Sequence, residues 1–293
     1  MLVSMNALLQ DAKKNVYAVG AFNVPTLEAV RGVIAAAEEE KCPVILQHAE
    51  MHGELIPLED IGPILIHYAK KASVPVAVHY DHGASFDGCV QAMKLGFTSV
   101  MYDASAKPFE ENARESAEIV KIARALGVTV EAELGHVFTS AVGGGEGRGP
   151  VGAEDFASLD DCYTNPAEAR KFVEMTGVDA LAIAFGTTHG VYLTEPKLNL
   201  ERIAEIRREI DIPFVMHGGS GVSDADYRTA IKNGIAKINY YTYMAMAGGE
   251  AVAKSVNSKG EGDKVFFHDV AQTGMQAMKE NAAAAMKIFS MKS

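Results

Sequence analysis

The sequence contains few cysteines and no long apolar run. Its three cysteines, Cys42, Cys89 and Cys162, are odd in number and lack C-x-x-C spacing, which excludes a disulfide framework and a cysteine-based zinc module. No apolar run approaches the roughly 18 residues of a membrane span, and the N-terminal residues lack the basic and apolar regions of a signal peptide. We therefore expect a soluble, cytoplasmic protein whose cysteines are reduced packing residues.

Positive charge is also scarce. The 293 residues include 27 Lys and Arg against 38 Asp and Glu, giving a formal net charge of −11, and the basic residues form no block. This balance argues against nucleic acid and anionic membranes as partners. A small anionic substrate remains compatible with it, provided that backbone N–H groups or basic side chains gather at one place.

What the sequence does contain is a repeat of strand and helix. Eight short apolar segments alternate with helical segments, a pattern typical of a parallel sheet covered on both faces. Such a repeat favours a closed (β/α)₈ TIM barrel, which often occupies about 250 residues, and no G-x-G-x-x-G motif follows the first strand. We predict one α/β barrel domain over residues 1–293, with strands at 17–24, 44–49, 74–82, 99–104, 129–134, 180–185, 213–218 and 237–241.

Two further helices are expected outside the barrel count, one at the start of the chain and one near residues 265–291. The second either caps the barrel or contacts a neighbouring subunit. The best-marked helix begins after Asn165, with Pro166 at its first position, Glu168 in its first turn and Gly177 past its end, which are preferred residues at helix boundaries.

Histidines occur where several predicted strands end. In a barrel of this kind the chemistry lies at the carboxyl ends of the strands, and His82, His189 and His217 end the third, sixth and seventh strands. Three neutral imidazoles with an open fourth position form a catalytic zinc arrangement. Carboxylates end two other strands, at Asp103 and Glu133. The alternative for each histidine is a hydrogen-bonded residue of the rim.

A glycine-rich turn, Gly218-Gly219-Ser220-Gly221, directly follows the seventh strand and leads into a helix. Backbone N–H groups of such turns bind phosphate without net positive charge, and the loops after strands seven and eight are the recurrent phosphate site of this barrel. Strand eight adds Asn239 and Thr242. The turn alone is also compatible with a tight connection that has no ligand.

Residues 135–164 have no periodicity and include the glycine-rich run 143–149, which contains Glu146. Unstructured loops of this length in a compact domain are usually lids or disordered segments. A mobile lid that carries Glu146 would deliver a general acid or base when it closes. The alternative is a solvated, flexible insertion.

Taken together, these motifs resemble one family over essentially the whole chain, the class II, zinc-dependent ketose-bisphosphate aldolases that act on fructose and tagatose bisphosphates. The resemblance rests on several short motifs in the same order, namely Gly20-Ala21-Phe22-Asn23, His79-Tyr80-Asp81-His82-Gly83, Ser99-Val100-Met101-Tyr102-Asp103, Glu131-Ala132-Glu133-Leu134-Gly135, Tyr163-Thr164-Asn165-Pro166, Gly186-Thr187-Thr188-His189-Gly190, His217-Gly218-Gly219-Ser220-Gly221 and Lys237-Ile238-Asn239. Several motifs in one order are far more specific than any one of them.

The resemblance implies a role for each motif. Zn²⁺ would be held by His82, His189 and His217, and Asp103 with Glu133 would offer a second or alternate divalent position. Asp81 would be the general base at the C4 hydroxyl, and Glu146 would exchange the proton at the dihydroxyacetone phosphate carbon. The substrate, with a monovalent cation near its phosphate, would contact Asn23, Gly190, Gly218, Gly219, Ser220, Asn239 and Thr242.

The activity implied is that of a lyase of carbohydrate metabolism and glycolysis. It would reversibly cleave fructose 1,6-bisphosphate or tagatose 1,6-bisphosphate into dihydroxyacetone phosphate and glyceraldehyde 3-phosphate, as a homodimer or homotetramer. Its partner would be a small phosphorylated sugar, with no nucleic acid and no membrane. A metallohydrolase and a non-catalytic sugar-phosphate binder are the alternatives from other classes.

Three departures from the family concern the aldehyde half of the site. Tyr240 and Tyr241 stand where the family usually has Asn-x-Asp-Thr or Asn-Val-Ala-Thr, and His48-Ala49-Glu50-Met51-His52 replaces a serine-bearing turn. An arginine that some members use for the distal phosphate has no clear counterpart in residues 286–293. A different ketose phosphate, or a sugar-acid phosphate, is therefore an alternative substrate.

Overall fold

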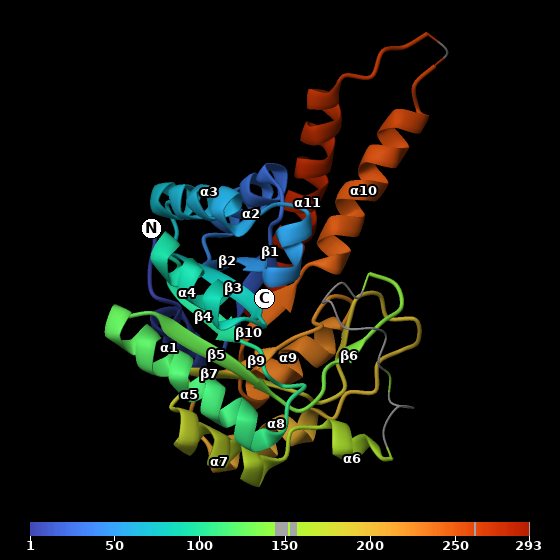
Figure 1. The fold of residues 1–293 in the computed structure, drawn as a ribbon. Helices are drawn as coiled ribbons and strands as arrows, with labels where there is room; N and C mark the ends of the chain where they lie inside the picture. The colour runs from blue at the N-terminus through green and yellow to red at the C-terminus, as the bar shows by residue number, and fades with distance from the viewer. Residues whose placement is uncertain (144–151, 153–156, 261, 293) are drawn as a thin grey trace.

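A closed barrel of eight parallel strands forms the centre of the computed structural model (Figure 1), which describes residues 1–143, 152, 157–260 and 262–292. Neighbouring strands follow the order β1-β10-β9-β7-β5-β4-β3-β2, and β2 closes the ring on β1. The predicted (β/α)₈ barrel is thus confirmed. Its strands are β1 (Val19–Asn23), β2 (Val44–Ala49), β3 (Val76–Gly83), β4 (Ser99–Tyr102), β5 (Thr129–Leu134), β7 (Ala180–Ile183), β9 (Phe214–Met216) and β10 (Ile235–Tyr240).

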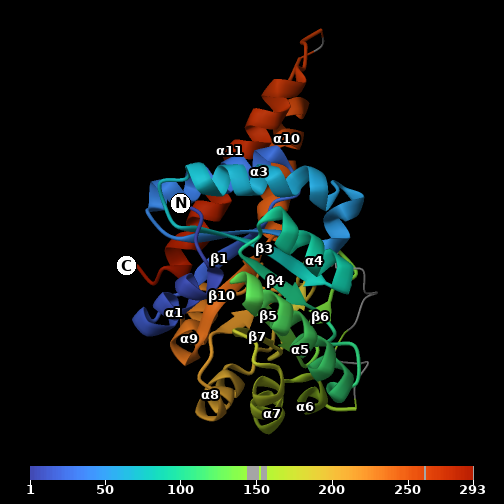
Figure 2. The same cartoon turned by 60° about the vertical axis from the view of Figure 1, so that its left-hand side comes forward.

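Helices surround the barrel on its outer side, as the two views in Figures 1 and 2 agree. The predicted boundary residues of α7 act as expected: Oδ1 of Asn165 accepts from the backbone N–H groups of Ala167 and Glu168, and Gly177 ends the helix at a φ of 67°. The main helices are α1 (Met5–Asn15), α2 (Leu27–Glu40), α3 (Leu58–Lys71), α4 (Phe86–Leu95), α5 (Phe109–Leu126), α7 (Pro166–Thr176), α8 (Leu200–Glu209), α9 (Asp224–Asn233), α10 (Thr242–Asn257) and α11 (Phe267–Phe289).

The inside of the barrel changes character along its axis. Met5 and Leu9 of α1 pack against Ala21, Ile45 and Val215 in one apolar cluster, so α1 plugs the end where the strands begin. A polar layer lies further along the strands and is fully buried, with Gln47, His79, Ser99, Glu131, His217 and Lys237 all at 0% exposure. Because buried polar groups need partners, this layer marks the end of the barrel where chemistry is expected.

Residues 135–164 contain more regular structure than the sequence indicated. β6 (Phe138–Thr139) pairs in parallel with β8 (Thr188–His189), and a short helix, α6, covers Leu159–Cys162. A 3₁₀ turn, η1 (Glu50–Glu54), also follows β2. Elements this short have no detectable periodicity, and β6 depends on a partner about fifty residues away in the sequence. Glu146 lies outside the described residues.

The last two helices form a hairpin that projects from the barrel (Figure 1). We call α10 with α11 the arm. The C-terminal end of α11 returns to the barrel, where the buried Phe289 accepts a hydrogen bond from the N–H of Ala18 at 2.9 Å. α11 also packs against α2. Among the described residues, no helix is long and apolar enough to cross a membrane.

Candidate active site

The three strand-end histidines converge at one place. The ring centroid of His82 lies 4.5 Å from that of His217 and 5.3 Å from that of His189, and the other two centroids are 5.7 Å apart. One ligand atom from each ring falls within 4.8 Å of the others. All three rings are buried, with at most 8% exposure. The sequence separates His82 and His217 by more than a hundred residues, and the closed sheet brings these two together, whereas His189 lies in β8, which pairs with β6.

His82 is held in an unusual backbone conformation. Its φ of 46° lies in the left-handed region, which non-glycine residues rarely adopt and which often marks functional sites. Nδ1 of His82 lies 2.7 Å from Oδ2 of Asp103 in a hydrogen bond. The next residue, Gly83, is tightly enclosed, because a Cβ there would lie 2.7 Å from the carbonyl oxygen of Met101. The strand end is therefore constrained on both sides.

Two carboxylates and a lysine surround His217. Nε2 of His217 is hydrogen-bonded to Oε1 of Glu131 at 2.9 Å, and Oε2 of Glu131 accepts from Nζ of Lys237 at 2.8 Å. Nδ1 of His217 lies 3.2 Å from Glu133 but makes no hydrogen bond there. Burial and His82 lower the pKa of His217, but Glu131 and Glu133 outweigh them and raise it to about 9. The two carboxylates therefore favour positive charge at or beside the His217 ring.

A second candidate metal group shares His82 with the first. His82, Asp103 and Glu133 each offer one ligand atom within 4.8 Å of the others. Oγ of Ser105 donates to Asp103 at 2.7 Å and also lies 3.1 Å from Oε1 of Glu133. The structure thus brings together the two carboxylates that the sequence predicted as an alternate position, and Ser105 links them.

Asp81 lies in the same layer, almost fully buried at 1% exposure. Oδ2 accepts hydrogen bonds from the side-chain amides of Asn23 and Gln47 at 2.9 and 3.0 Å, and Oδ1 accepts from Asn239 at 3.1 Å. Burial raises the pKa of Asp81, but His82 and Lys237 outweigh it and hold the pKa below its usual value. The carboxylate is therefore ionised and fixed by three neutral donors.

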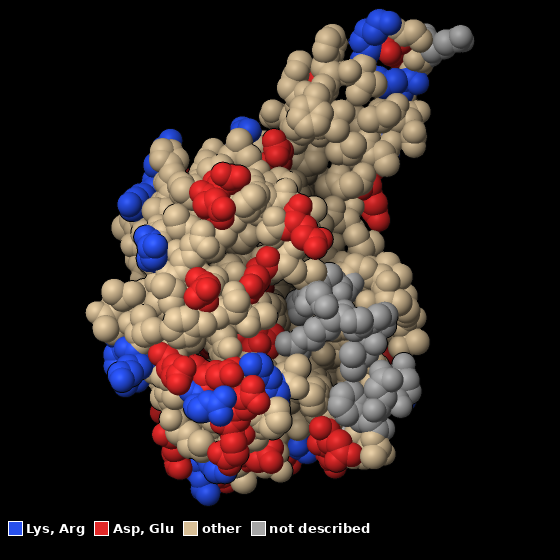
Figure 3. Space-filling model, viewed as in Figure 1, with Lys and Arg blue, Asp and Glu red and all other residues tan. Residues whose placement is uncertain are grey.

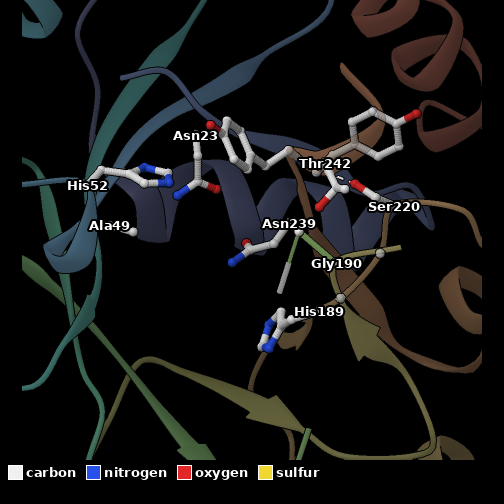
Figure 4. Close-up of a pocket in the computed structure, with 13 residues that line it drawn as sticks. Asn23, Ala49, His52, His189, Gly190, Ser220, Asn239 and Thr242 are labelled. Carbon is white, nitrogen blue, oxygen red and sulfur yellow. Dashed lines mark hydrogen bonds between the residues drawn. The ribbon is translucent and has the colours of Figure 1, made fainter. Parts of the chain in front are cut away.

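The glycine-rich turn after β9 borders the pocket next to this layer. In Figure 4, Gly190, Ser220 and Thr242 lie at one side of the pocket, with Asn239 and His189 between them and the other side. A Cβ on Gly218, at a φ of 60°, would lie 2.6 Å from the backbone of Thr188. The hydroxyl of Tyr192 donates to the carbonyl of Gly218 at 2.9 Å. The turn is thus closely packed against Thr188 and Tyr192.

The predicted cap of the following helix is also present. Oγ of Ser223 accepts from the N–H of Asp226 at 3.2 Å and begins α9. Backbone N–H groups at such a turn are suited to an anion. The pocket lining includes Gly190, Gly218, Gly219, Ser220, Asn239 and Thr242, which are the residues that the sequence indicated for phosphate.

Comparison with known proteins agrees with this arrangement. The model of the family described as fructose-bisphosphate aldolase class-II matches residues 3–293. The chain belongs to the class II fructose-bisphosphate aldolase family. It is therefore an enzyme of the aldehyde-lyase class. The family acts on phosphorylated sugars and is typically zinc-dependent.

Two relatives and two solved structures illustrate the similarity. The chain is 42% identical to YdjI of Escherichia coli, described as uncharacterised, over 99% of this chain and 98% of YdjI. It is 40% identical to a probable fructose-bisphosphate aldolase of Bacillus subtilis, over 98% and 97% of the two chains. The crystal structure of the YdjI aldolase superposes with a TM-score of 0.85 at 38% identity, covering 99% and 97% of the two chains. That of the Campylobacter jejuni fructose-bisphosphate aldolase gives 0.79 at 25% identity, covering 98% and 95%.

The donor set of this aldolase fits the metal of its family. Buried imidazole nitrogens with carboxylate oxygens nearby are the ligands that Zn²⁺ prefers. Nδ1 of His217 is a fully buried nitrogen with no hydrogen-bond partner in the described part of the chain, which is rare in a folded protein unless a ligand completes it. The residues therefore fit a divalent ion beside His217.

Several residues of the site were not assigned roles from the sequence. Gln47, Ser105 and Glu131 lie at strand ends or just beyond, and their positions were the only signal available. His52 lies in η1, lines the pocket and has its ring centroid 4.9 Å from that of Tyr241. The sequence marked His52 only as part of a segment that departs from the family, and the structure places its ring in the pocket lining.

His79 and Lys237 belong to the polar layer and do not line the pocket. Nδ1 of His79 is hydrogen-bonded to Oγ of Ser99 at 2.9 Å, and burial followed by Lys237 lowers the pKa of His79 to about 3. Lys237 is fully buried against Glu131. Both side chains support the site from inside the barrel.

Proposed function

We propose that this aldolase cleaves a ketose phosphate reversibly into dihydroxyacetone phosphate and an aldehyde, with Zn²⁺ held by His82, His189 and His217. Asp103 and Glu133 provide the second or alternate divalent position. The observation that carries the proposal is the convergence of three buried imidazoles beside a glycine-rich turn. A divalent ion there would polarise the ketose carbonyl and stabilise the negative charge that cleavage leaves on the enediolate.

In this proposal the phosphate of the dihydroxyacetone half binds the turn after β9, with a monovalent cation nearby. Its ligands are backbone N–H groups and small polar side chains, which suits a protein with a net charge of −11. Oδ1 of Asn239, an acceptor with no hydrogen-bond partner in the described residues, adjoins the pocket and suits the monovalent cation or a substrate hydroxyl rather than the phosphate oxygens. The proposed contacts are Asn23, Gly190, Gly218, Gly219, Ser220, Asn239 and Thr242.

Asp81 is the proposed general base. Cleavage breaks the C3–C4 bond: the proton of the C4 hydroxyl passes to Asp81, the bonding electron pair remains on C3 as the enediolate, and the aldehyde leaves. The lowered pKa of Asp81 and its three amide donors support an ionised carboxylate at this point. The proton that returns to C3 is assigned to Glu146, which lies outside the described residues.

Fructose 1,6-bisphosphate and tagatose 1,6-bisphosphate, which would give glyceraldehyde 3-phosphate as the aldehyde, are the substrates that the family suggests. The first experiment is a coupled assay for dihydroxyacetone phosphate with the purified enzyme. A chelator should abolish turnover and Zn²⁺ should restore it. Turnover that survives chelation, and that borohydride stops only when substrate is present, would instead indicate a Schiff-base lysine and overturn the proposal.

We also propose that the protein is a cytoplasmic homodimer or homotetramer that assembles through the arm. Figure 3 shows that the arm surface in that view is mostly uncharged below its tip. Phe266 and Phe267, where the arm turns, are 56% and 84% exposed. Large exposed apolar groups favour protein contacts. Light scattering on the wild type and on Phe267→Asp tests this: a monomeric wild type would contradict it. The three cysteines are buried and free, which supports the proposed cytoplasmic location.

A further inference from the structure

The two ends of the active-site pocket differ in chemistry. Gly190 and Thr242 lie at one end together with Ser220 of the glycine-rich turn, and His52 lies with Ala49 at the other end (Figure 4). If the dihydroxyacetone phosphate half occupies the first end, as proposed above, the aldehyde half faces His52. We call the surroundings of His52 and Ala49 the aldehyde end.

The aldehyde end is built from aromatic and imidazole rings. The ring centroid of His52 lies 4.9 Å from that of Tyr241 and 6.1 Å from that of His48. His48 is fully buried, and both of its ring nitrogens lack a hydrogen-bond partner in the described part of the chain. Burial, with His52, lowers the pKa of His48 to about 4, so the ring is neutral. A neutral imidazole offers one donor and one acceptor.

The N–H groups at the start of α4 are occupied by Glu50, the residue that follows Ala49. The N–H groups of Ala84 and Ser85, where α4 begins, donate to Oε2 of Glu50 at 2.5 and 3.2 Å, and Oγ of Ser85 donates to Oε1 at 2.8 Å. A helix start of this kind would otherwise suit a phosphate. Glu50 follows Ala49 directly in the chain and belongs to η1 together with His52, so the segment that carries His52 also carries a negative charge.

The described residues that line the pocket carry no positive charge from lysine or arginine. None of the 13 lining residues drawn in Figure 4 is lysine or arginine. The buried ammonium of Lys237 is paired with Glu131 at 2.8 Å. A second phosphate dianion at this end would therefore find no cation among the lining residues, which is unfavourable in a partly desolvated site.

We propose that the aldehyde half of the substrate is an uncharged polyhydroxylated chain that hydrogen-bonds to His52 beside the ring of Tyr241, with the ring of His48 behind His52. The preferred substrate is then a ketose 1-phosphate in place of a 1,6-bisphosphate. This inference rests on the proposed function and specifies its substrate class. Hydroxyl groups both donate and accept, which matches the hydrogen-bonding capacity of an imidazole ring, and the sugar's C–H face packs on an aromatic ring.

The test is aldol addition by the zinc-loaded enzyme with dihydroxyacetone phosphate and a panel of aldehydes. The panel holds both enantiomers of glyceraldehyde, a neutral tetrose, glyceraldehyde 3-phosphate and an aldehyde with a terminal carboxylate. We expect kcat/KM for a neutral aldehyde to exceed that for either charged class by about tenfold or more. Preference for glyceraldehyde 3-phosphate, or for the carboxylated aldehyde, would overturn the inference.

Two variants locate the effect. His52→Ala should lower kcat/KM for neutral aldehydes by about tenfold, mainly through KM, because it removes a hydrogen-bonding partner. The control is His67→Ala, an exposed histidine on α3, which should behave as wild type. Glu50→Gln keeps an acceptor for the N–H groups of α4 but removes the charge, so use of glyceraldehyde 3-phosphate should improve. Equal losses in both histidine variants, or no response to Glu50→Gln, would contradict the assignment.

Proton exchange at dihydroxyacetone phosphate alone separates this inference from the proposed function. That half-reaction needs no aldehyde, so His52→Ala should retain it, which also shows that the variant is folded. If the wild type shows neither exchange nor addition with any aldehyde, the proposed aldolase function fails. If exchange is normal and phosphorylated aldehydes are preferred, only the inference about the aldehyde end fails.

Discussion

Lys237 and Glu131 form a fully buried ion pair, with Nζ of the lysine 2.8 Å from Oε2 of the glutamate. The other carboxylate oxygen of Glu131 is hydrogen-bonded to Nε2 of His217. Burial raises the pKa of Glu131, but Lys237 and His217 outweigh it and hold the pKa well below its usual value. An ionised Glu131 fixes the proton on Nε2 and directs Nδ1 toward the other histidines, as carboxylates do behind metal-ligating histidines.

Glu131→Gln should therefore weaken Zn²⁺ binding by about 10- to 100-fold, measured by competition with a chelating dye. It should also destabilise the fold by roughly 3 to 5 kcal/mol, because Lys237 is left buried and unpaired. The double variant Glu131→Gln with Lys237→Met should regain much of that stability and keep the weak Zn²⁺ binding. Wild-type Zn²⁺ affinity in the single variant would mean that the pair only supports the barrel.

Asp81→Asn should retain metal and lose cleavage. The amide is nearly isosteric, and the side-chain amides of Asn23 and Asn239 can rotate to present oxygens to it, so the barrel should remain folded. Without a base at the C4 hydroxyl we expect kcat to fall by about 10²- to 10⁴-fold. Metal analysis of the purified variant accompanies the assay, and loss of metal would reassign Asp81 as a structural residue or a ligand.

Gly219→Ala should weaken phosphate binding specifically. A Cβ at this position would lie 2.7 Å from the carbonyl oxygen of Asn239 and 2.7 Å from Cγ2 of Ile238, so the turn must shift. We expect KM for the ketose phosphate to rise by about tenfold, a value typical of lost binding contacts. Gly249→Ala is the control, since its added Cβ meets nothing within 4 Å. Equal KM values in the two variants would contradict the phosphate assignment.

His48 should make the protein sensitive to acid. Its folded-state pKa of about 4 lies below the roughly 6.5 of an exposed histidine, so between these values the unfolded chain binds more protons. Stability from this group is full above the higher value and declines as the pH falls toward the lower one. From pH 6.5 to 5 the loss should be roughly 1 to 2 kcal/mol. Urea unfolding with chelator should give a shallower pH slope for His48→Asn; equal slopes would disprove the effect.

The sequence by itself determined the barrel and the rim on which the site lies. Alternation of apolar strands and helices is a local pattern, and a closed parallel sheet then places all strand ends on one rim. His82, His189 and His217 could therefore be assigned to one place before any coordinates were known. The glycine-rich turn at 218–221 was also recognisable from the sequence, because its chemistry depends on consecutive residues.

Only the tertiary structure decided which side chains meet within that rim. The amide of Asn239 reaches Asp81 across 158 positions, and Glu131 reaches His217 across 86. These contacts depend on strand register and side-chain rotamers, which no local pattern encodes. The same holds for His52, whose side chain lines the pocket from η1. It also holds for Glu50, whose carboxylate accepts hydrogen bonds at the start of α4. The metal and phosphate half of the site could thus be predicted from strand ends, whereas the sequence marked the aldehyde end only as a departure from the family, and the contacts within it required the folded chain.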